Sequence, residues 1–492
     1  MAEQNHHKME RRSAQDTGQA PEAVRYRAEP GPSVGASRGV HRCRVLFITY
    51  HFPPSMEVGA QSSAQNVRYL PLHGVEPIVL TVQAGHYMGV SCGLDVDDKG
   101  VFQGRVIRTA VVPHPYVVYR FFRQRLRSAT DRNLGQRNAS DSRLWQSAVG
   151  RWALSLLETP DIYTGWFIPA VASGLGEIRR SGVNHLLSSA PCWTNHLVGL
   201  ALSRLTGLPW IAHFRDPWTQ VPRWKPTSHL SARIEATLER MVVRHASSVV
   251  CVTDRHTALL QQCYPDLPPG KFTTIPNGYD EAEWNSMAGD VTSAVNLKND
   301  RFTITYTGSF HQERSPYPLF RALRDLADRG EVDLARVKVD LIGWCEITEG
   351  RSVKKMAAEF GLSGCVNIVG PLGRILSLRR LVQSDLLLLL AEGLTLQIPG
   401  KTYEYLRAGR PILALTSGGA LADLLRKTGG AWVVDPVNDN AVLGALREAY
   451  HGWNDGAVAP EPDRAVVADF DRRQLAGRFA ELFAESRVAR AE

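Results

Sequence analysis

The densest group of chemically useful side chains lies in residues 394–415, which read LTLQIPGKTYEYLRAGRPILAL. An apolar segment is followed by a Pro-Gly turn and then by Lys401, Tyr403 and Glu404. We expect a short helix that ends at Gly409, which puts Lys401 at a helix N-terminus, an electropositive place suited to phosphate. Glu404, three residues later, can accept hydrogen bonds from both hydroxyls of a ribose. The alternative is a surface pair between Lys401 and Glu404 at i,i+3 spacing.

A second candidate phosphate site lies in residues 306–316, YTGSFHQERSP. Gly308 and Ser309 can present backbone N–H groups to phosphate oxygens, and Arg314 adds a fixed cation. A diphosphate leaving group needs this combination, because preorganised donors and cations stabilise the charge that develops as the bond breaks. The alternative is that Arg314 is a solvated residue at the start of a helix.

Two charged residues, Arg215 and Asp216, directly follow the apolar segment of residues 209–214 (PWIAHF), which is predicted to be a strand. Side chains in this position lie at the edge of the sheet where ligands bind. Arg215, Asp216 and His213 are therefore the candidate catalytic residues. The alternatives are that Arg215 and Asp216 pair with each other or cap the next segment, and that His213 stays within its strand.

The loop of residues 50–63 contains a single glycine, Gly59, ahead of a predicted helix. A glycine there permits close approach of the backbone to a ligand. The loop is not G-x-G-x-x-G, so the dinucleotide fingerprint is absent, and an ordinary strand–helix connection is the alternative. The acidic residues at 95–98 resemble a metal-binding motif, but their Gly- and Asp-rich surroundings favour a solvated turn. No metal site is predicted.

These loops follow short apolar runs that alternate with helical patterns, as in a doubly wound α/β domain. Parallel strands are predicted at residues 45–48, 77–82, 185–189, 209–214 and 247–253. The pattern restarts at 301–310 and continues with strands predicted at 337–343, 366–370, 385–391, 411–415 and 431–435. The fold class is therefore α/β, with two tandem domains. Ligands bind at the carboxyl ends of such strands, so two domains that face each other make a cleft between them.

The chain divides into four predicted parts: a disordered tail at 1–41, a first domain at 42–285, a second at 286–460, and a C-terminal segment at 461–492. The tail is polar and rich in Gly and Pro, which argues against a packed core. In the last part the apolar residues share one helical face. They are Leu475, Phe479, Leu482 and Phe483.

The charge of the protein is concentrated in one segment. The 492 residues carry a net charge of +8, with 44% hydrophobic and 22% charged residues, which is typical of a folded globular protein. Between Arg105 and Arg151 there are ten arginines, no lysine and two acids, so the remainder of the chain is neutral. A nucleic-acid-binding domain spreads its basic residues over a whole face, so no nucleic-acid partner is expected.

The seven cysteines form no C-x-x-C pair and are odd in number, which fits neither a disulfide framework nor a zinc site. A reducing compartment is the natural one. No apolar run reaches the roughly 18 residues of a membrane span, and the first thirty or so residues lack the apolar core of a secretion signal. We therefore expect a cytoplasmic protein.

Six stretches together resemble the retaining glycosyltransferases of family 4, which have the GT-B fold of two facing Rossmann-like domains. They are ITYHFPPSMEVGAQSSAQNVRYLPLHGVEPIVLTV (48–82), SSAPCWTNH (188–196), LPWIAHFRDPW (208–218), TTIPNGYD (273–280), YTGSFHQERSP (306–316) and IPGKTYEYLRAGRPILAL (398–415). The resemblance runs from about residue 43 to 485.

The resemblance implies that the first domain holds an acceptor and the second a nucleotide-sugar donor. Gly59 matches the glycine loop near the diphosphate and acceptor. Gly308, with Ser309 beside it, and Arg314 match the loop that grips the diphosphate. Glu404 matches the second glutamate of a paired motif and binds the ribose, with Lys401 and Tyr403 as further donor-binding candidates. Members of this kind generally need no metal or other cofactor.

Two positions depart from the family pattern. The first glutamate of the pair is replaced by Leu396, which leaves the identity of the sugar open. Arg215 stands where the family often has a histidine, so no general base is assigned, and Arg215 can instead contact an acidic acceptor or the donor phosphate. We hypothesise front-face transfer, with the acceptor proton passing to the departing phosphate, which Gly308, Arg314 and Lys401 hold.

Other functions stay open. A glycosyltransferase-like partner subunit without catalytic activity is suggested by Leu396 and Arg215, and a nucleotide-sugar 2-epimerase would share the fold. The acceptor can be a polysaccharide, a lipid-linked sugar or a specialised metabolite.

A basic amphipathic helix is predicted at residues 117–127. Val118, Phe122 and Leu126 recur on one face, beside Phe121, and four arginines fill much of the rest. Such a helix can lie on an anionic membrane at the inner face of the cell or meet an anionic acceptor. The alternative is an Arg-rich solvated helix.

Overall fold

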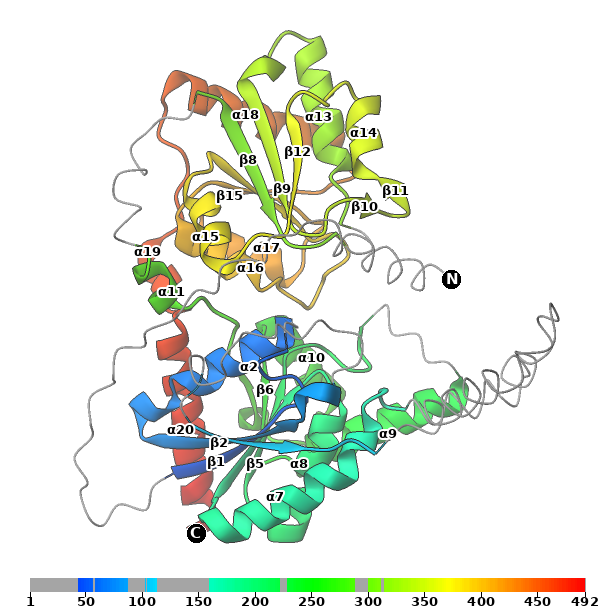
Figure 1. The fold of residues 1–492 in the computed structure, drawn as a ribbon, viewed down its shortest axis with the longest axis vertical. Coiled ribbons are helices and arrows are strands. Elements are labelled where there is room, and N and C mark those ends of the chain that lie inside the picture. Colours follow the sequence, from blue (N-terminus) through cyan, green and yellow to red (C-terminus); the bar gives the residue numbers. More distant parts are fainter. Residues whose placement is uncertain are drawn as a thin grey trace, which may run out of the picture.

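The computed structural model describes residues 43–55, 58–86, 102, 104–112, 159–221, 228–287, 300–310 and 314–491. The predicted tail at 1–41, the acidic loop at 95–98 and the basic helix at 117–127 lie outside these residues. The described chain forms two α/β halves, one above the other, which are joined at one side near α11 (Glu281–Asn285) and α19 (Arg464–Ala468) (Figure 1).

In the described residues, the first half is built on a seven-stranded sheet in the order β3-β2-β1-β4-β5-β6-β7, and all neighbouring strands are parallel. The strands are β1 (Cys43–Ile48), β2 (Val75–Val82), β3 (Arg105–Thr109), β4 (His185–Ala190), β5 (Trp210–Phe214), β6 (Ser248–Cys251) and β7 (Phe272–Thr274). The strand order reverses between β1 and β4. Ligands of doubly wound sheets bind at this switch point, outside the carboxyl ends of the strands.

Helices cover both faces of this sheet. On one face Val45 and Phe47 of β1 pack with α2 (Val58–Arg68) and α20 (Arg472–Ala491). On the other face the core includes residues of four further helices. They are α7 (Phe167–Ser181), α8 (Thr194–Thr206), α9 (His229–His245) and α10 (Asp254–Cys263). Because both faces are covered, β1 reads as a continuous apolar run rather than an alternating one.

The second half repeats this plan with a six-stranded parallel sheet in the order β12-β9-β8-β13-β14-β15. The strands are β8 (Phe302–Thr307), β9 (Val337–Ile342), β12 (Val366–Gly370), β13 (Leu386–Leu390), β14 (Ile412–Leu415) and β15 (Ala431–Val434). A small antiparallel hairpin of β10 (Ile347–Thr348) and β11 (Arg351–Ser352) follows β9. Here the switch point lies between β8 and β13.

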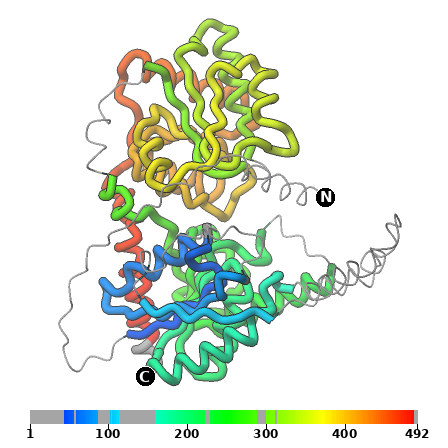
Figure 2. The backbone as a smooth tube through the Cα atoms, viewed as in Figure 1, coloured from blue at the N-terminus to red at the C-terminus, as the bar shows by residue number. Residues whose placement is uncertain are grey.

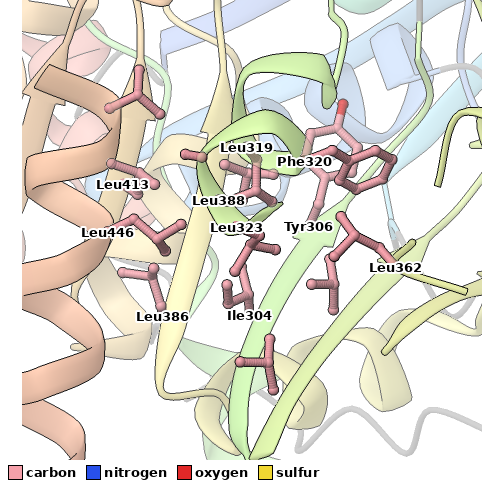
Figure 3. Packing of buried hydrophobic residues seen from close by; sticks show 14 of the residues in the cluster. Ile304, Tyr306, Leu319, Phe320, Leu323, Leu362, Leu386, Leu388, Leu413 and Leu446 are labelled. Carbon is pink, nitrogen blue, oxygen red and sulfur yellow. The ribbon is translucent and has the colours of Figure 1, made fainter. Parts of the chain in front are cut away.

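Two layers of helices enclose the second sheet. They are α13 (Tyr317–Asp328), α14 (Val353–Glu359) and α18 (Asp439–Asp455) on one face, and α15 (Arg374–Val382), α16 (Lys401–Ala408) and α17 (Ala420–Thr428) on the other. On the first face Ile304 and Leu388 of the strands pack with Leu323 and Leu446 of α13 and α18 (Figure 3).

The chain crosses between the halves twice. It leaves the first sheet through α11 and returns from α19 into α20, which runs back along the first half (Figure 2). The two crossings touch: Arg472 donates from its backbone N–H to the carbonyl of Tyr279 at 3.0 Å and from Nε to the carbonyl of Gly278 at 3.2 Å. In α20 all four residues of the predicted apolar face are buried against the first half.

The carboxyl ends of the two sheets meet directly. Thr253, just after β6, donates from Oγ1 to the carbonyl of Leu396, which follows β13, at 2.7 Å. Beside it Arg255 of α10 forms a forked ion pair with Asp423 of α17, with N–O distances of 2.5 and 3.1 Å. The predicted ligand-binding edges of the two domains therefore face each other.

The predicted strands all occur, with ends that differ by at most three residues. The prediction missed β3, an edge strand that reads RVIRT and lacks an apolar run. It also missed helices such as α9, whose wide polar face hides the apolar stripe. None of the helices in the described part of the chain is long and apolar enough to cross a membrane.

Candidate functional site

Gly308 lies at the switch point of the second sheet, directly after β8. Its backbone has a φ of +120°, a region that side chains disfavour, and an added Cβ would lie 2.7 Å from Nζ of Lys401. A glycine is required here for the lysine to approach. The N–H of Gly308 donates to the carbonyl of Ile342 at 2.8 Å, so in this conformation it is used within the protein rather than offered to a phosphate.

Lys401 begins α16 and points back to the end of β8. Its Nζ donates to the carbonyl of Thr307 and lies 3.7 Å from the centre of the Tyr306 ring. Burial lowers the pKa of Lys401 well below its usual range, and the charge of Arg314 lowers it further. An anion beside Nζ would reverse this shift. Lys401 is therefore placed where its charge depends on a ligand.

Arg314 and Ser309 complete a group around Tyr306. The Tyr306 hydroxyl donates to the carbonyl of Ser309 at 3.1 Å and interacts with the side chain of Arg314. Thr348 of the hairpin donates to the backbone carbonyl of Arg314 at 3.1 Å. The structure thus brings Gly308, Ser309, Arg314 and Lys401 together, as the two separate motifs predicted.

Glu404 lies one helical turn after Lys401 but does not pair with it. Its Oε1 accepts a hydrogen bond from Nη1 of Arg374 at 2.6 Å, and 18% of its side chain is exposed. The same Arg374 also contacts Glu283 of α11. The surface pair of Lys401 with Glu404, the alternative interpretation, is not formed.

Tyr403 lies apart from this group. Its ring packs edge-on against Phe470, only 1% of the residue is exposed, and its hydroxyl has no hydrogen-bond partner among the described residues. Tyr405, which the sequence analysis did not single out, is the tyrosine that supports the site. Its hydroxyl accepts a hydrogen bond from the N–H of Thr307 at 2.8 Å and so fixes the end of β8.

In the first half, Arg215 follows β5 and joins the start of α2 to the end of β4. Its guanidinium donates to the carbonyls of Gly59 and Pro191 at 3.0 Å each and to that of Ala190 at 3.3 Å. A Cβ on Gly59 would lie 3.1 Å from Nη2 of Arg215, so the glycine gives the guanidinium room. Burial lowers the pKa of Arg215, while the nearby charge of Asp216 opposes this.

His213 and Asp216 face different environments. His213 is 3% exposed within β5, where its Nδ1 lies 3.1 Å from Oγ of Ser189 and its ring contacts Phe479 of α20. Burial and then Arg215 lower the pKa of His213 well below its usual range, so it is neutral. Asp216 instead reaches the second half, where its Oδ1 accepts from Nε2 of Gln397 at 2.5 Å.

Sequence reasoning missed Arg374 and Gln397. Arg374 lies 30 residues before its partner Glu404, on a different helix, and no spacing rule links the two. Gln397 directly follows Leu396, the residue that departs from the family motif. This departure was a signal in the sequence that the neighbouring residue could have a role. The two predicted groups, around Arg215 and around Lys401, lie on opposite halves and are linked here by the contact between Gln397 and Asp216.

Residues 148–283 match the family model described as Glycosyltransferase Family 4. This segment spans β4 to β7 and carries Arg215 and Asp216. It includes three of the six stretches that carry the resemblance, at 188–196, 208–218 and 273–280. No curated protein matches the sequence.

Solved structures with the same two-domain arrangement are numerous. Sucrose-phosphate synthase from Thermosynechococcus elongatus aligns with a TM-score of 0.58 at 14% identity, over 91% of this chain and 100% of that chain. HepE from Anabaena in complex with UDP gives 0.56 at 14%, over 90% and 100%. A glycosyltransferase from Rickettsia africae gives 0.56 at 13%, over 91% and 99%.

Likeness at these identities establishes the fold, and it confirms two facing Rossmann-like domains of the GT-B type. The family match lies in the half that carries Arg215 and Asp216. The chain therefore has the GT-B fold, and its residues 148–283 match the Glycosyltransferase Family 4 model.

Proposed function

We propose that the protein transfers a sugar from a nucleoside-diphosphate donor to an acceptor hydroxyl, with retention of the anomeric configuration. The observation that carries the proposal is the gathering of Gly308, Arg314 and Lys401 around Tyr306, with Glu404 one helical turn away. HepE, which shares the fold, has been solved with UDP and with UDP-glucose. Uridine nucleotides are therefore the first donors to test.

The proposed reaction needs stabilisation of a departing diphosphate. Arg314 supplies one positive charge, and Lys401 supplies a second at the same place once the donor diphosphate is bound. Charges held in position in this complex stabilise the anion that develops as the bond breaks. We therefore propose that no metal ion is required. Glu404 accepts the ribose hydroxyls, and Asp216 and Gln397 lie at the junction of the halves, where the sugar would be held.

The proposed step breaks the bond between the anomeric carbon and the diphosphate oxygen and forms the bond to the acceptor oxygen on the same face. The proton of the acceptor hydroxyl passes to the departing phosphate oxygen. This assignment agrees with the first half, where His213 is buried within its strand and Arg215 is engaged with three carbonyls. Neither is arranged as a general base.

We propose a glycan, a lipid-linked sugar or a specialised metabolite as the acceptor, and a cytoplasmic location. Contact of residues 117–127 with an anionic membrane is part of this proposal. Replacement of the four arginines Arg120, Arg123, Arg125 and Arg127 would then abolish partitioning onto anionic vesicles. Unchanged partitioning would remove the membrane from the proposal.

The test begins with thermal unfolding in the presence of UDP, GDP, ADP and dTDP. One nucleotide should raise the melting temperature, and Lys401→Ala and Glu404→Ala should abolish that rise and the transfer of sugar. Unchanged transfer in both variants would contradict the assignment. Analysis of the product anomer by NMR tests retention.

A second candidate is a partner subunit without catalytic activity. Leu396 favours it, because an apolar residue stands where a carboxylate would address the sugar, and its carbonyl is bound to Thr253. A flat response to all four nucleotides would support this candidate over the enzyme.

A further inference from the structure

Arg374, the first residue of α15, joins Glu404 to the connection between the halves. Nη1 donates to Oε1 of Glu404 at 2.6 Å, while Nη2 and Nε donate to Oε2 of Glu283 at 2.7 and 3.1 Å. Glu283 belongs to α11, the short helix through which the chain leaves the first half. One guanidinium therefore spans the proposed ribose ligand and the interdomain connection.

The two carboxylates compete for a single cation. The side chains of Glu283 and Glu404 are 13% and 18% exposed, so neither is well hydrated. Burial acts to lower the pKa of Arg374, but Glu404 and then Glu283 raise it above its usual range. For Glu283, burial raises the pKa of the carboxyl, and the charge of Arg374 opposes this rise. The position of the guanidinium is thus set by a balance between two acids.

The observed hydrogen bonds divide this guanidinium unequally. Glu283 takes two donors, Nε and Nη2, on one oxygen, and only Nη1 is left for Glu404. Arginine can also bind one carboxylate with two parallel hydrogen bonds, which would occupy both of its oxygens. As long as Glu283 holds its two donors, Arg374 engages Oε1 of Glu404 alone, and Oε2 accepts no hydrogen bond from the described residues.

The same helix provides a matched comparison. Glu281, two residues earlier, forms a forked pair with Arg407 at 2.6 and 2.6 Å, and its side chain is 22% exposed. Arg407 also lies on α16 but makes no contact with Glu404 among the interactions of the described residues. Glu281 and Glu283 therefore both tie α11 to the second half, and only Glu283 acts on the proposed ribose ligand.

We propose that Arg374 is a positioning residue for Glu404, and that Glu283 restrains it so that one oxygen of Glu404 stays open to the ribose hydroxyls. Selection of a ribonucleotide over its 2′-deoxy analogue then depends on a residue of the interdomain connection. This inference rests on the proposed function, in which Glu404 binds the ribose.

The experiment measures the dissociation constants of UDP, of its 2′-deoxy analogue and of inorganic pyrophosphate by calorimetry, in the full chain. The unmodified protein should prefer UDP to the deoxy analogue by about tenfold, the value of one hydrogen bond to a charged acceptor. In the Glu283→Gln variant, the guanidinium of Arg374 should bind both oxygens of Glu404. The ratio of the dissociation constants of the deoxy analogue and UDP should then fall to near one. Pyrophosphate, which lacks a ribose, should bind both proteins equally.

Glu281→Gln is the control and should keep the full preference, since it weakens the same helix without releasing Arg374. If the Glu283→Gln variant does not fold, the Arg374→Lys variant is measured instead. Lysine keeps the positive charge but cannot bridge the two carboxylates as arginine does. The preference should fall in that variant too.

The outcomes separate the two claims. If the unmodified protein binds none of UDP, GDP, ADP and dTDP, the proposed function fails. If it binds UDP but shows no preference for the ribose, or if the preference survives in Glu283→Gln or in its substitute Arg374→Lys, this inference fails while the donor class stands. Loss of the preference for UDP in the Glu281→Gln variant would also overturn this inference. A general loosening of α11 would then explain the loss of preference in both variants.

Discussion

Lys401 is a residue whose charge depends on a ligand. Its ammonium is enclosed by the Tyr306 ring and the carbonyl of Thr307, and burial lowers its pKa. A diphosphate placed beside it would raise that pKa again. At a pH between the two pKa values, the free protein holds a neutral lysine and the complex a charged one.

Binding of UDP should therefore take up a proton, and the affinity should fall as the pH rises through the pKa of the complex. Calorimetry in buffers of different ionisation enthalpy, over the neutral to mildly alkaline range, counts the proton. Lys401→Arg is the control, because an arginine does not titrate there. Equal proton uptake in the variant and the unmodified protein would show that another group is responsible.

Arg215 is predicted to matter for stability as well as for the site. Arg215→Met removes the guanidinium from the carbonyls of Gly59, Ala190 and Pro191. The Gly59 carbonyl keeps the Ser63 hydroxyl as a donor, and the Ala190 carbonyl keeps the backbone N–H of residue 215. We expect a loss of about 1–3 kcal/mol in the free energy of unfolding, measured with urea. The affinity for UDP should change little, because its proposed ligands lie in the other half. A loss below about 1 kcal/mol would mean that water replaces the guanidinium.

At the scale of elements, α20 completes the core of the first half. Phe483 is fully buried and its ring lies 5.5 Å from that of His185 in β4. Phe483→Ala should lower the free energy of unfolding by about 3–5 kcal/mol. Glu485→Ala, an exposed change on the same helix, should stay within about 0.5 kcal/mol. Equal effects of the two changes would contradict the packing of α20 described here.

The same scale shows what sequence reasoning could and could not predict. Buried parallel strands such as β13, which reads LLLLL, were predictable because an apolar run of strand length has few other structures. That Gly308 and Lys401 lie close together was predictable because the loops after parallel strands meet at one edge. Arg374 was not, because its position against Glu404 follows from the packing of α15 on α16. Tyr403 and Tyr405 were not distinguishable either, since both are buried and only the structure shows which hydroxyl meets β8.

At the scale of the whole molecule, the ion pair of Arg255 with Asp423 is one of the contacts that hold the halves together. Both side chains are 47% exposed, so the pair adds little to the stability of either half. Arg255→Glu would place two negative charges opposite each other and should separate the halves, which raises the radius of gyration in small-angle scattering. Adding Asp423→Arg restores the attraction and should reverse the change. An unchanged radius in the single variant would show that other contacts, such as that of Thr253 with Leu396, are sufficient.

The return of α20 also has a consequence for synthesis on the ribosome. Its residues Leu475, Phe479 and Phe483 cover the face of the first sheet that includes Val45 and Phe47, yet they are translated only after the whole second half. Domains generally fold as units in the order in which they emerge. Here the half made first must wait with one apolar face incomplete, while the half made second can close as soon as β15 and α18 have emerged. The first half is therefore the part of the nascent chain that a chaperone would have reason to hold.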